Sequence, residues 1–194
     1  MSSIPITGVL LAGGLGRRMG GVDKGLQVLN GQSLAAHAVA RFAPQVDRLL
    51  INANRNVERY AALGYPVVAD AIPDFAGPLA GLHAALSAAT TPLIATVPCD
   101  SPFLPVDLVS RLFSALTAAG AEIAVAQTGN QAHPVFCLCR RDLLPHLTAY
   151  LAAGQRRFEG WYASLNAVMV PFDDQPEAFE NINSPEELAR FARP

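Results

Sequence analysis

Short apolar runs recur along the chain and predict β-strands. Most of them are continuous stretches of Val, Leu, Ile and Ala, which is typical of strands that are covered on both faces. The runs occupy residues 7–12, 48–53, 66–69, 92–97, 122–127, 134–139 and 167–172.

Amphipathic patterns lie between most of these runs and predict helices. They cover residues 33–42, 57–63, 79–88, 105–118, 142–153 and 185–192. Strands that alternate with helices indicate a mostly parallel sheet with helices on both faces, and therefore a three-layer, doubly wound, Rossmann-like α/β fold. The last helix has a clear start, because Ser184 can cap it with Pro185 at the first position and Glu187 at the third.

The pattern continues without a linker, an internal repeat or a low-complexity tract. The chain has 194 residues, of which 51% are hydrophobic and 15% charged, so it can bury one sizeable core. We therefore expect residues 1–194 to form a single domain.

Charge and hydropathy argue against two classes of partner. The formal net charge is −2, which gives no long-range attraction to nucleic acid or to an anionic membrane surface. Residues 75–99 contain no Asp, Glu, Lys or Arg and are long enough to span a bilayer. Because Pro78, Pro92 and Pro98 divide this segment, we interpret it as a turn, a helix and a buried strand inside the fold.

The cysteines and the first residues predict a cytoplasmic location. Cys99, Cys137 and Cys139 form no CxxC pair and leave one residue over, which argues against a disulfide framework or a zinc site. We expect Cys137 and Cys139 to share one face of a strand as small core residues. The opening "MSSIPITG" has neither the basic segment nor the long apolar segment of a signal peptide.

The first strand runs into a glycine-rich, basic segment, "LLAGGLGRRMGGVDKG" at 10–25. Glycine is costly to order, but bare backbone lets an anion approach the N–H groups closely. Arg17, Arg18 and Lys24 add positive charge, so the segment predicts a phosphate-binding loop.

Two better-known phosphate-binding motifs do not match this loop. A dinucleotide fingerprint starting at Gly14 would need its third glycine where Met19 stands. A P-loop ending at Gly21 would need Lys and then Ser or Thr, whereas the chain has Val22 and Asp23. The loop therefore belongs to another class of phosphate site.

Polar residues also follow the next three predicted strands. Asn52 and Asn54 lie at the end of the second strand, Asp70 after the third, and Asp100 after the fourth in "PCDSP". In an open α/β sheet, ligands bind outside the carboxyl ends of the strands. A basic loop and two carboxylates at one edge suit a nucleoside triphosphate with Mg²⁺.

Together these motifs resemble the nucleotidyltransferases that activate sugar phosphates and cofactors, and in the "LAGG" and "GGVDK" details they are similar to the molybdenum cofactor guanylyltransferases. The resemblance covers nearly the whole chain. Its further motifs occur in the order of that family: "INANR" (51–55), "GPLAG" (77–81), "PCDSP" (98–102), "HP" (133–134), "AGQRR" (153–157) and "NINSPEEL" (181–188).

The resemblance implies a reaction in which GTP and molybdenum-loaded molybdopterin give the guanine dinucleotide form of the cofactor and pyrophosphate. The alternatives are a cytidylyltransferase or sugar-phosphate nucleotidyltransferase of the same fold, or a non-catalytic carrier of the cofactor. The "LAGG" form favours guanylyl transfer, since cytidylyl relatives tend to carry "LAAG". The expected partners are GTP, molybdopterin, other proteins of cofactor biosynthesis and recipient apoenzymes, and we expect a monomer.

The resemblance also implies roles for residues in the N-terminal half, which would bind GTP. Leu11, Ala12, Gly13 and Gly14 would contact the nucleotide through their backbone, and Lys24 would reach its phosphates as a catalytic cation.

Further roles on the nucleotide side follow from the same resemblance. Arg17 and Arg18 are candidates for the phosphate side, and Asn52 and Asp70 would contact the nucleoside. Asp100 would bind the nucleotide, hold Mg²⁺ and take part in catalysis.

The C-terminal half would bind molybdopterin. Arg156 and Arg157, together with Asn181 and Asn183, match positions of the family on that side. For His133 the sequence leaves two readings open, a site residue or a residue that caps the start of a strand.

Overall fold

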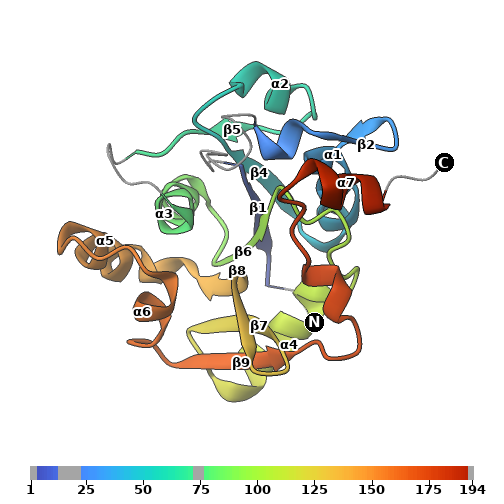
Figure 1. Ribbon diagram of the computed structural model, residues 1–194. Coiled ribbons are helices and arrows are strands. Elements are labelled where there is room, and N and C mark those ends of the chain that lie inside the picture. Colours follow the sequence, from blue (N-terminus) through green and yellow to red (C-terminus); the bar gives the residue numbers. More distant parts are fainter. Residues whose placement is uncertain (1–3, 13–22, 72–76, 192–194) are drawn as a thin grey trace.

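The computed structural model describes residues 4–12, 23–71 and 77–191, and its centre is a seven-stranded sheet (Figure 1). The strand order is β5-β4-β1-β6-β8-β7-β9. The strands are β1 (Ile6–Leu11), β4 (Arg48–Asn52), β5 (Val67–Val68), β6 (Leu93–Pro98), β7 (Ile123–Thr128), β8 (Gln131–Arg140) and β9 (Ala167–Pro171). Only β8 runs antiparallel to its neighbours in this sheet, so the predicted mostly parallel sheet is confirmed.

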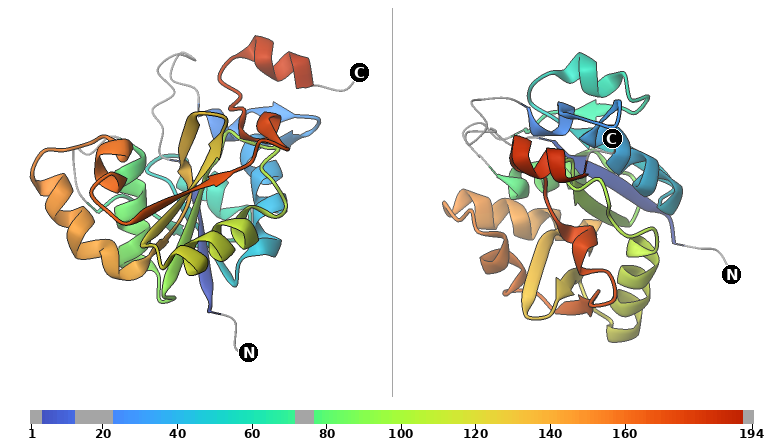
Figure 2. Two further views of the ribbon diagram at one scale, coloured as in Figure 1. Left: turned by 90° about the horizontal axis from the view of Figure 1, so that it is seen from below. Right: turned by 45° about the vertical axis from the view of Figure 1, so that its right-hand side comes forward.

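Helices cover both faces of the sheet. The α-helices are α1 (Leu34–Phe42), α2 (Val57–Ala61), α3 (Pro78–Ala88), α4 (Leu108–Ala119), α5 (Leu144–Ala152), α6 (Phe158–Tyr162) and α7 (Pro185–Phe191). Short 3-10 turns lie at η2 (Lys24–Leu26), η3 (Ala43–Gln45), η4 (Arg141–Leu143) and η5 (Pro176–Phe179). Helices α1 and α4 lie on one face, and α3, α5 and α6 lie on the other (Figure 2).

The alternation of side chains along β1 explains the three layers. Leu10 packs into the core formed with α1 and α4, whereas Val9 and Leu11 pack into the core formed with α3 and α5. Each face of the strand therefore buries apolar surface, as the continuous apolar run predicts. Cys137 and Cys139 lie together in the second core, which confirms their predicted common face.

The structure adds elements that the sequence pattern did not predict. A hairpin joins β2 (Val28–Leu29) to β3 (Gln32–Ser33) through Asn30 and Gly31, which have φ of 50° and 84°. Positive φ at both turn residues is the type I′ geometry that Asn-Gly favours. The two strands have only two residues each, which is too short for an alternation of apolar and polar residues to be recognised. Helix α6 was also missed, because its five residues are too few to show the helical spacing of apolar positions.

Helix α4 begins three residues later than the predicted start at 105. Asp107 is its N-cap residue, and the backbone N–H of Val109 donates to Gln45 Oε1 at 3.0 Å. The preceding proline-containing segment therefore forms a turn and not the first turn of the helix.

The predicted membrane-length segment is divided as expected into α3 and β6. Within the described residues, no helix combines the length and the apolar character that crossing a membrane requires.

Candidate functional site

The carboxyl ends of β1, β4 and β6 lie side by side at one end of the sheet, which we call the rim. Hydrogen bonds join these ends closely: the Ala12 N–H donates to the Asn52 carbonyl at 2.8 Å, and the Cys99 N–H donates to the Leu11 carbonyl at 3.1 Å. Leu11 and Ala12 are buried, and these two backbone groups are already bonded within the sheet. Asn52 and Asp100 are thereby fixed beside the segment that enters the glycine-rich loop.

Lys24 lies at the centre of the rim, at the start of η2. Its Nζ lies 3.6 Å from Asp100 Oδ2 and donates a hydrogen bond of 2.5 Å to Asn183 Oδ1. The Lys24 side chain is 25% exposed and that of Asp100 14%, so the charges are partly shielded from water but open to a ligand. Three predicted site residues that are distant in sequence therefore meet at one point.

Asp100 stands in a partly buried, hydrogen-bonded turn after β6. Burial raises the pKa of its carboxyl group, and the Lys24 ammonium and a backbone hydrogen bond oppose that rise. Its own carbonyl accepts from the Ile182 N–H at 2.9 Å. The N-cap of the next α-helix is Asp107, so Asp100 does not serve as that cap.

Asn52 and Asp70 form a second polar group on the rim. Asn52 Nδ2 donates to Asp70 Oδ1 at 2.9 Å, and Asn54 Nδ2 donates to Asp70 Oδ2 at 2.7 Å. The Asp70 N–H in turn donates to Asn54 Oδ1 at 2.8 Å. The two asparagines therefore fix both oxygens of this carboxylate.

Gly81 on α3 makes room for that group. A Cβ at this position would lie 2.4 Å from Asn52 Oδ1 and 2.9 Å from Leu11 Cδ2, both far inside contact distance. The second glycine of "GPLAG" is therefore required for the close approach of α3 to the end of β4.

The other side of the rim is built by residues 171–183, which we call the strap. The strap leaves β9, passes through η5 and brings Asn181 and Asn183 to the turn after β6 and to Lys24. Asn181 Oδ1 accepts from Ser101 Oγ at 2.5 Å, and Asn183 Nδ2 donates to the Asn181 carbonyl at 3.1 Å.

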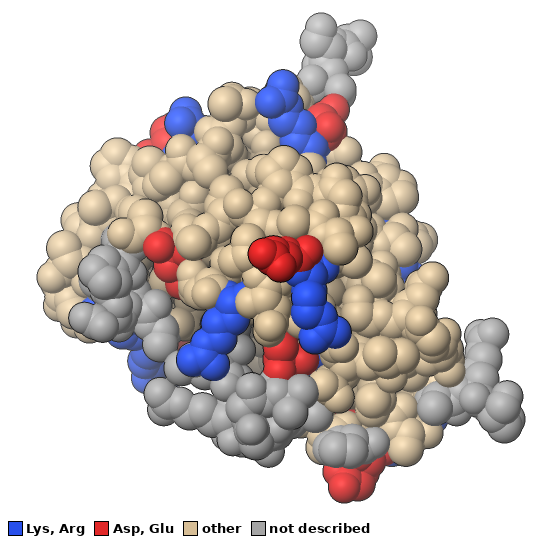
Figure 3. Space-filling view, turned by 90° about the horizontal axis from the view of Figure 1, so that it is seen from above, with Lys and Arg blue, Asp and Glu red and all other residues tan. Residues whose placement is uncertain are grey.

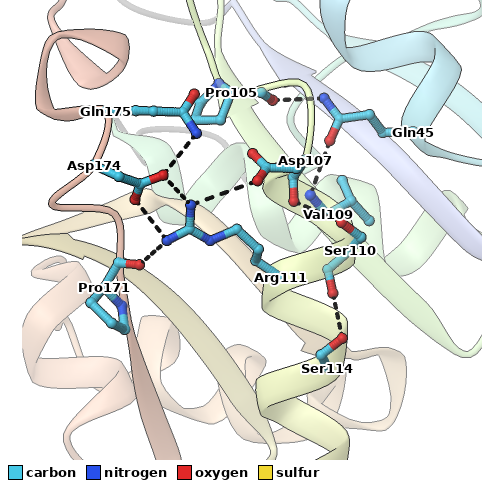
Figure 4. Close-up of polar contacts among 10 residues, drawn as sticks. All are labelled: Gln45, Pro105, Asp107, Val109, Ser110, Arg111, Ser114, Pro171, Asp174 and Gln175. Atoms are coloured by element: carbon cyan, nitrogen blue, oxygen red, sulfur yellow. Dashed lines mark hydrogen bonds and ion pairs between the residues drawn. The ribbon is translucent and has the colours of Figure 1, made fainter.

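Arg111 of α4 anchors the start of the strap (Figure 4). Its guanidinium donates two hydrogen bonds of 3.0 Å to the Asp174 carboxylate and another to the Pro171 carbonyl, and it lies 3.9 Å from the centre of the Phe172 ring. Asp107 forms a further ion pair with it at 3.6 Å. The guanidinium lowers the pKa of Asp174 to about 2, so this carboxylate stays ionised at neutral pH.

His133 lies in β8 beside the strap. Its ring stacks on Phe179 with centroids 4.7 Å apart, and its Nε2 lies 2.7 Å from Thr128 Oγ1. Burial lowers the pKa of this imidazole, which favours the neutral form at neutral pH. His133 therefore lies inside strand β8 and packs against the strap. It is not at the start of the strand, so the hypothesis that it caps the strand is wrong.

Arg156 and Arg157 lie elsewhere, on the exposed turn between α5 and α6. Arg156 donates to the carbonyls of Leu151 and Gln155, and the Arg157 carbonyl accepts from Tyr150 Oη. These hydrogen bonds are local to the turn, and the contacts of Lys24 described above are to Asp100 and Asn183. Their predicted role toward the acceptor stays a prediction.

Four further predicted residues lie outside the described part of the chain. They are Gly13, Gly14, Arg17 and Arg18.

The described residues contain no cluster of three or more His, Cys, Asp or Glu side chains that could hold a metal ion. Asp100 is the carboxylate that forms an ion pair with Lys24 at the rim. Magnesium keeps several waters and is commonly bound by one or two carboxylates together with phosphate oxygens, so this donor set fits Mg²⁺ that arrives with a nucleotide.

Positive and negative side chains are interspersed on the face in Figure 3, where Lys and Arg groups stand singly beside Asp and Glu groups on a largely uncharged surface. Among the described residues on this face, the cations therefore form no broad positive patch.

Two residues next to Lys24 were missed by the sequence reasoning. Asp23 accepts hydrogen bonds from Asn56, the N-cap residue of α2, and from Tyr60, the fourth residue of that helix. Asp23 could have been noticed because it directly precedes the lysine in "GGVDK". Tyr60 gave no signal, since an apolar ring at a helical position reads as an ordinary core residue.

Comparisons with known proteins identify the family of this chain. A profile of the MobA-like NTP transferase domain matches residues 8–168. The chain is 53% identical, over 96% of both chains, to a protein named molybdenum cofactor guanylyltransferase from Ralstonia nicotianae. It is 50% identical, again over 96% of both chains, to a protein of the same name from Shewanella putrefaciens.

Solved structures show the same fold. Molybdopterin-guanine dinucleotide biosynthesis protein A from Archaeoglobus fulgidus superposes with a TM-score of 0.78 at 23% identity, over 96% of both chains. A 4-diphosphocytidyl-2C-methyl-D-erythritol synthase from Anaerococcus prevotii reaches 0.75 at 12% identity, over 96% of this chain and 94% of that one. With a family profile over most of its length and relatives at half identity, the chain belongs to the MobA-like NTP transferase domain family.

Proposed function

We propose that this protein is a molybdenum cofactor guanylyltransferase, which transfers GMP from GTP to molybdenum-loaded molybdopterin and releases pyrophosphate. The shared name of the relatives at 50–53% identity over nearly full length supports the reaction. The observation that links this reaction to particular residues is that Lys24 contacts both Asp100 and Asn183 at the rim.

The transfer is a direct displacement at phosphorus. A terminal phosphate oxygen of molybdopterin attacks the α-phosphorus of GTP, a new P–O bond forms, and the bond to the β-phosphate oxygen breaks in line with it. Negative charge grows on the leaving pyrophosphate, so catalysis needs fixed positive charge near these oxygens.

Lys24 supplies one such charge. Its ammonium has three donors, and its side chain is only partly exposed, so an electrostatic contact with phosphate is stronger there than in open water. When phosphates occupy the rim, Lys24 exchanges its contacts to Asp100 and Asn183 for phosphate oxygens.

Asp100 is the residue that would hold magnesium. The bound ion supplies further positive charge to the phosphate oxygens. The turn after β6 keeps the carboxylate in place through its backbone bond to Ile182 and through the bond between Ser101 and Asn181.

Asp70 would recognise the nucleoside. Guanine presents its N1–H and its 2-amino group as donors, and a carboxylate held by Asn52 and Asn54 is a suitable acceptor for these groups or for ribose hydroxyls. Leu11 and Ala12 would line the same side through their backbone.

The strap would face molybdopterin. Asn181 and Asn183 offer amide donors and acceptors beside Lys24, and Arg156 and Arg157 add positive charge from the α5–α6 turn. We place the protein in the cytoplasm as a monomer, with GTP and molybdopterin as substrates.

The choice of base tests this assignment. With GTP and CTP at equal concentration, Mg²⁺ and molybdenum-loaded molybdopterin, the guanine dinucleotide should form at least about tenfold faster, because a polar site built for guanine leaves groups unpaired around another base. Mass spectrometry of the products measures the ratio. Equal yields of both dinucleotides would contradict guanylyl transfer and favour the cytidylyl alternative.

A further inference from the structure

Lys24 stands between two neighbours that are fixed by one buried side chain, Tyr60. On one side of the lysine, Tyr60 Oη donates a hydrogen bond of 2.5 Å to Asp23 Oδ1. Asn56 Nδ2 donates to the other carboxylate oxygen of Asp23 at 2.9 Å. Both oxygens of Asp23 are therefore held by α2 and its N-cap residue.

On the other side of the lysine, Gly25 packs directly against the same hydroxyl. A Cβ on Gly25 would lie 2.5 Å from Tyr60 Oη and 2.8 Å from Cys99 Sγ. Cys99 is the residue before Asp100, so the tyrosine hydroxyl lies where the Lys24 turn and the Asp100 turn approach each other. The residues on both sides of Lys24 thus take their positions from Tyr60.

Tyr60 is suited to hold these neighbours without reaching a ligand itself. Its side chain is 0% exposed and belongs to the core that packs against α1 and α4. Burial, with the nearby acidic groups, raises the pKa of the phenol well above its usual range, so the hydroxyl keeps its proton and donates. A buried, permanently protonated donor makes a rigid anchor.

We propose that Tyr60 is a positioning residue for Lys24, acting through its hydrogen bond to Asp23 and its contact with Gly25. The inference rests on the proposed function, in which Lys24 contacts the phosphates. Small displacements of a charge at a reacting centre cost large factors in rate, so an anchor outside the site controls turnover. Among the described residues, the side-chain hydrogen bonds of Asp70 go to Asn52 and Asn54 and involve neither Tyr60 nor Asp23.

The test is a double-mutant cycle on the purified full chain with GTP, Mg²⁺ and molybdenum-loaded molybdopterin. Tyr60→Phe keeps the ring and removes only the hydroxyl, and we expect kcat to fall about tenfold because Asn56 still holds Asp23. Lys24→Ala removes the positioned group, with an expected loss of about 100-fold. In the double variant the loss should stay near 100-fold, since Tyr60 has no lysine left to position.

Tyr65→Phe is the matched control, because Tyr65 is partly buried against the same core and its hydroxyl makes no recorded hydrogen bond among the described residues. This variant should keep the kcat of the wild type. Should Tyr60→Phe fail to fold, Asp23→Ala removes the same bond from its half-buried end, and the same cycle with Lys24→Ala applies.

The outcomes separate the positioning role from a general structural one. A double variant about 1,000-fold slower than wild type would mean that the two losses multiply, and Tyr60 would then act independently of Lys24. An unchanged kcat in Tyr60→Phe would also overturn the inference. Failure of the wild type to form any dinucleotide would instead contradict the proposed function, so the two failures are distinguishable.

Discussion

The two sides of the rim are built by different means. On the proposed nucleotide side, Asn52 and Asp100 sit at the ends of β4 and β6, the parallel strands on either side of β1, and backbone hydrogen bonds to β1 fix their distance. On the acceptor side, Asn181 and Asn183 arrive on the strap, which depends on single anchors such as Arg111. The proposed nucleotide side is therefore held by the hydrogen-bond ladder of the sheet, whereas the strap lies outside that ladder and is held by side-chain contacts, buried side chains and isolated backbone bonds.

This difference in construction has a consequence for function. A site that must hold a triphosphate in line for attack gains from a preorganised frame, because the charges then need no rearrangement during the reaction. A strap held by fewer contacts can be disturbed without disturbing that frame. Substitutions on the two sides should accordingly affect different kinetic constants.

The largest effect is expected at Asp100. Asp100→Asn keeps the size of the side chain but loses the negative charge that would hold magnesium, so single-turnover transfer should fall by about two to four orders of magnitude, equivalent to roughly 3–5 kcal/mol of barrier. GTP binding, followed in parallel across a magnesium titration, should change much less. Near-normal rates at low magnesium would place the metal elsewhere.

Lys24→Ala comes next, with a loss of about 100-fold in transfer and weaker GTP binding, because one cation near the phosphates is removed. The side chain is partly exposed and outside the core, so the melting temperature should hardly move. A fall of many degrees, with normal activity per folded molecule, would show that the lysine is structural.

Gly81→Ala tests the close approach on the nucleotide side. The added Cβ would collide with Asn52 and disturb the amide that holds Asp70, so the Kd for GTP should rise about tenfold. The KM for molybdopterin should stay as in the wild type, measured at saturating GTP. A change in the acceptor constant alone would reverse the assignment of the two sides.

Arg111→Met tests the acceptor side and should have a smaller effect than the three substitutions above. Loss of the paired hydrogen bonds to Asp174 loosens the strap, and we expect the KM for molybdopterin to rise about threefold while the Kd for GTP stays constant. Asp174→Asn, which weakens the same pair from its exposed end, should give a smaller change in the same direction. Weaker GTP binding in either variant would mean that the two sides are not separable.

The nucleotide side could be predicted from sequence because it follows from local rules. Continuous apolar runs give the strands, parallel strands end at one edge, and the polar residues that follow them must meet there. Lys24 and Asp100 were found in this way, and the structure brings them to 3.6 Å.

The acceptor side and the anchors could not be predicted in the same way. Arg111 and Asp174 are 63 residues apart and look like ordinary surface charges until the fold pairs them. Tyr60 has the sequence position of an ordinary core residue, and only the hydrogen bond from its hydroxyl to Asp23 distinguishes it. For Arg156 and Arg157, no sequence pattern indicates where they lie relative to Lys24. A contact between side chains that are far apart in the sequence produces no periodic pattern, so it cannot be predicted from periodicity.

The fate of the GTP phosphates tests the central claim most directly. Wild-type protein is incubated with Mg²⁺ and GTP labelled at either the α- or the γ-phosphate, with and without molybdenum-loaded molybdopterin, and the products are separated. We predict that the α-label enters the dinucleotide and the γ-label leaves in pyrophosphate, and that both events require the acceptor. Binding of the cofactor without any labelled product would indicate a carrier, and γ-label in the pterin product would indicate phosphoryl transfer; either result would contradict GMP transfer at this rim.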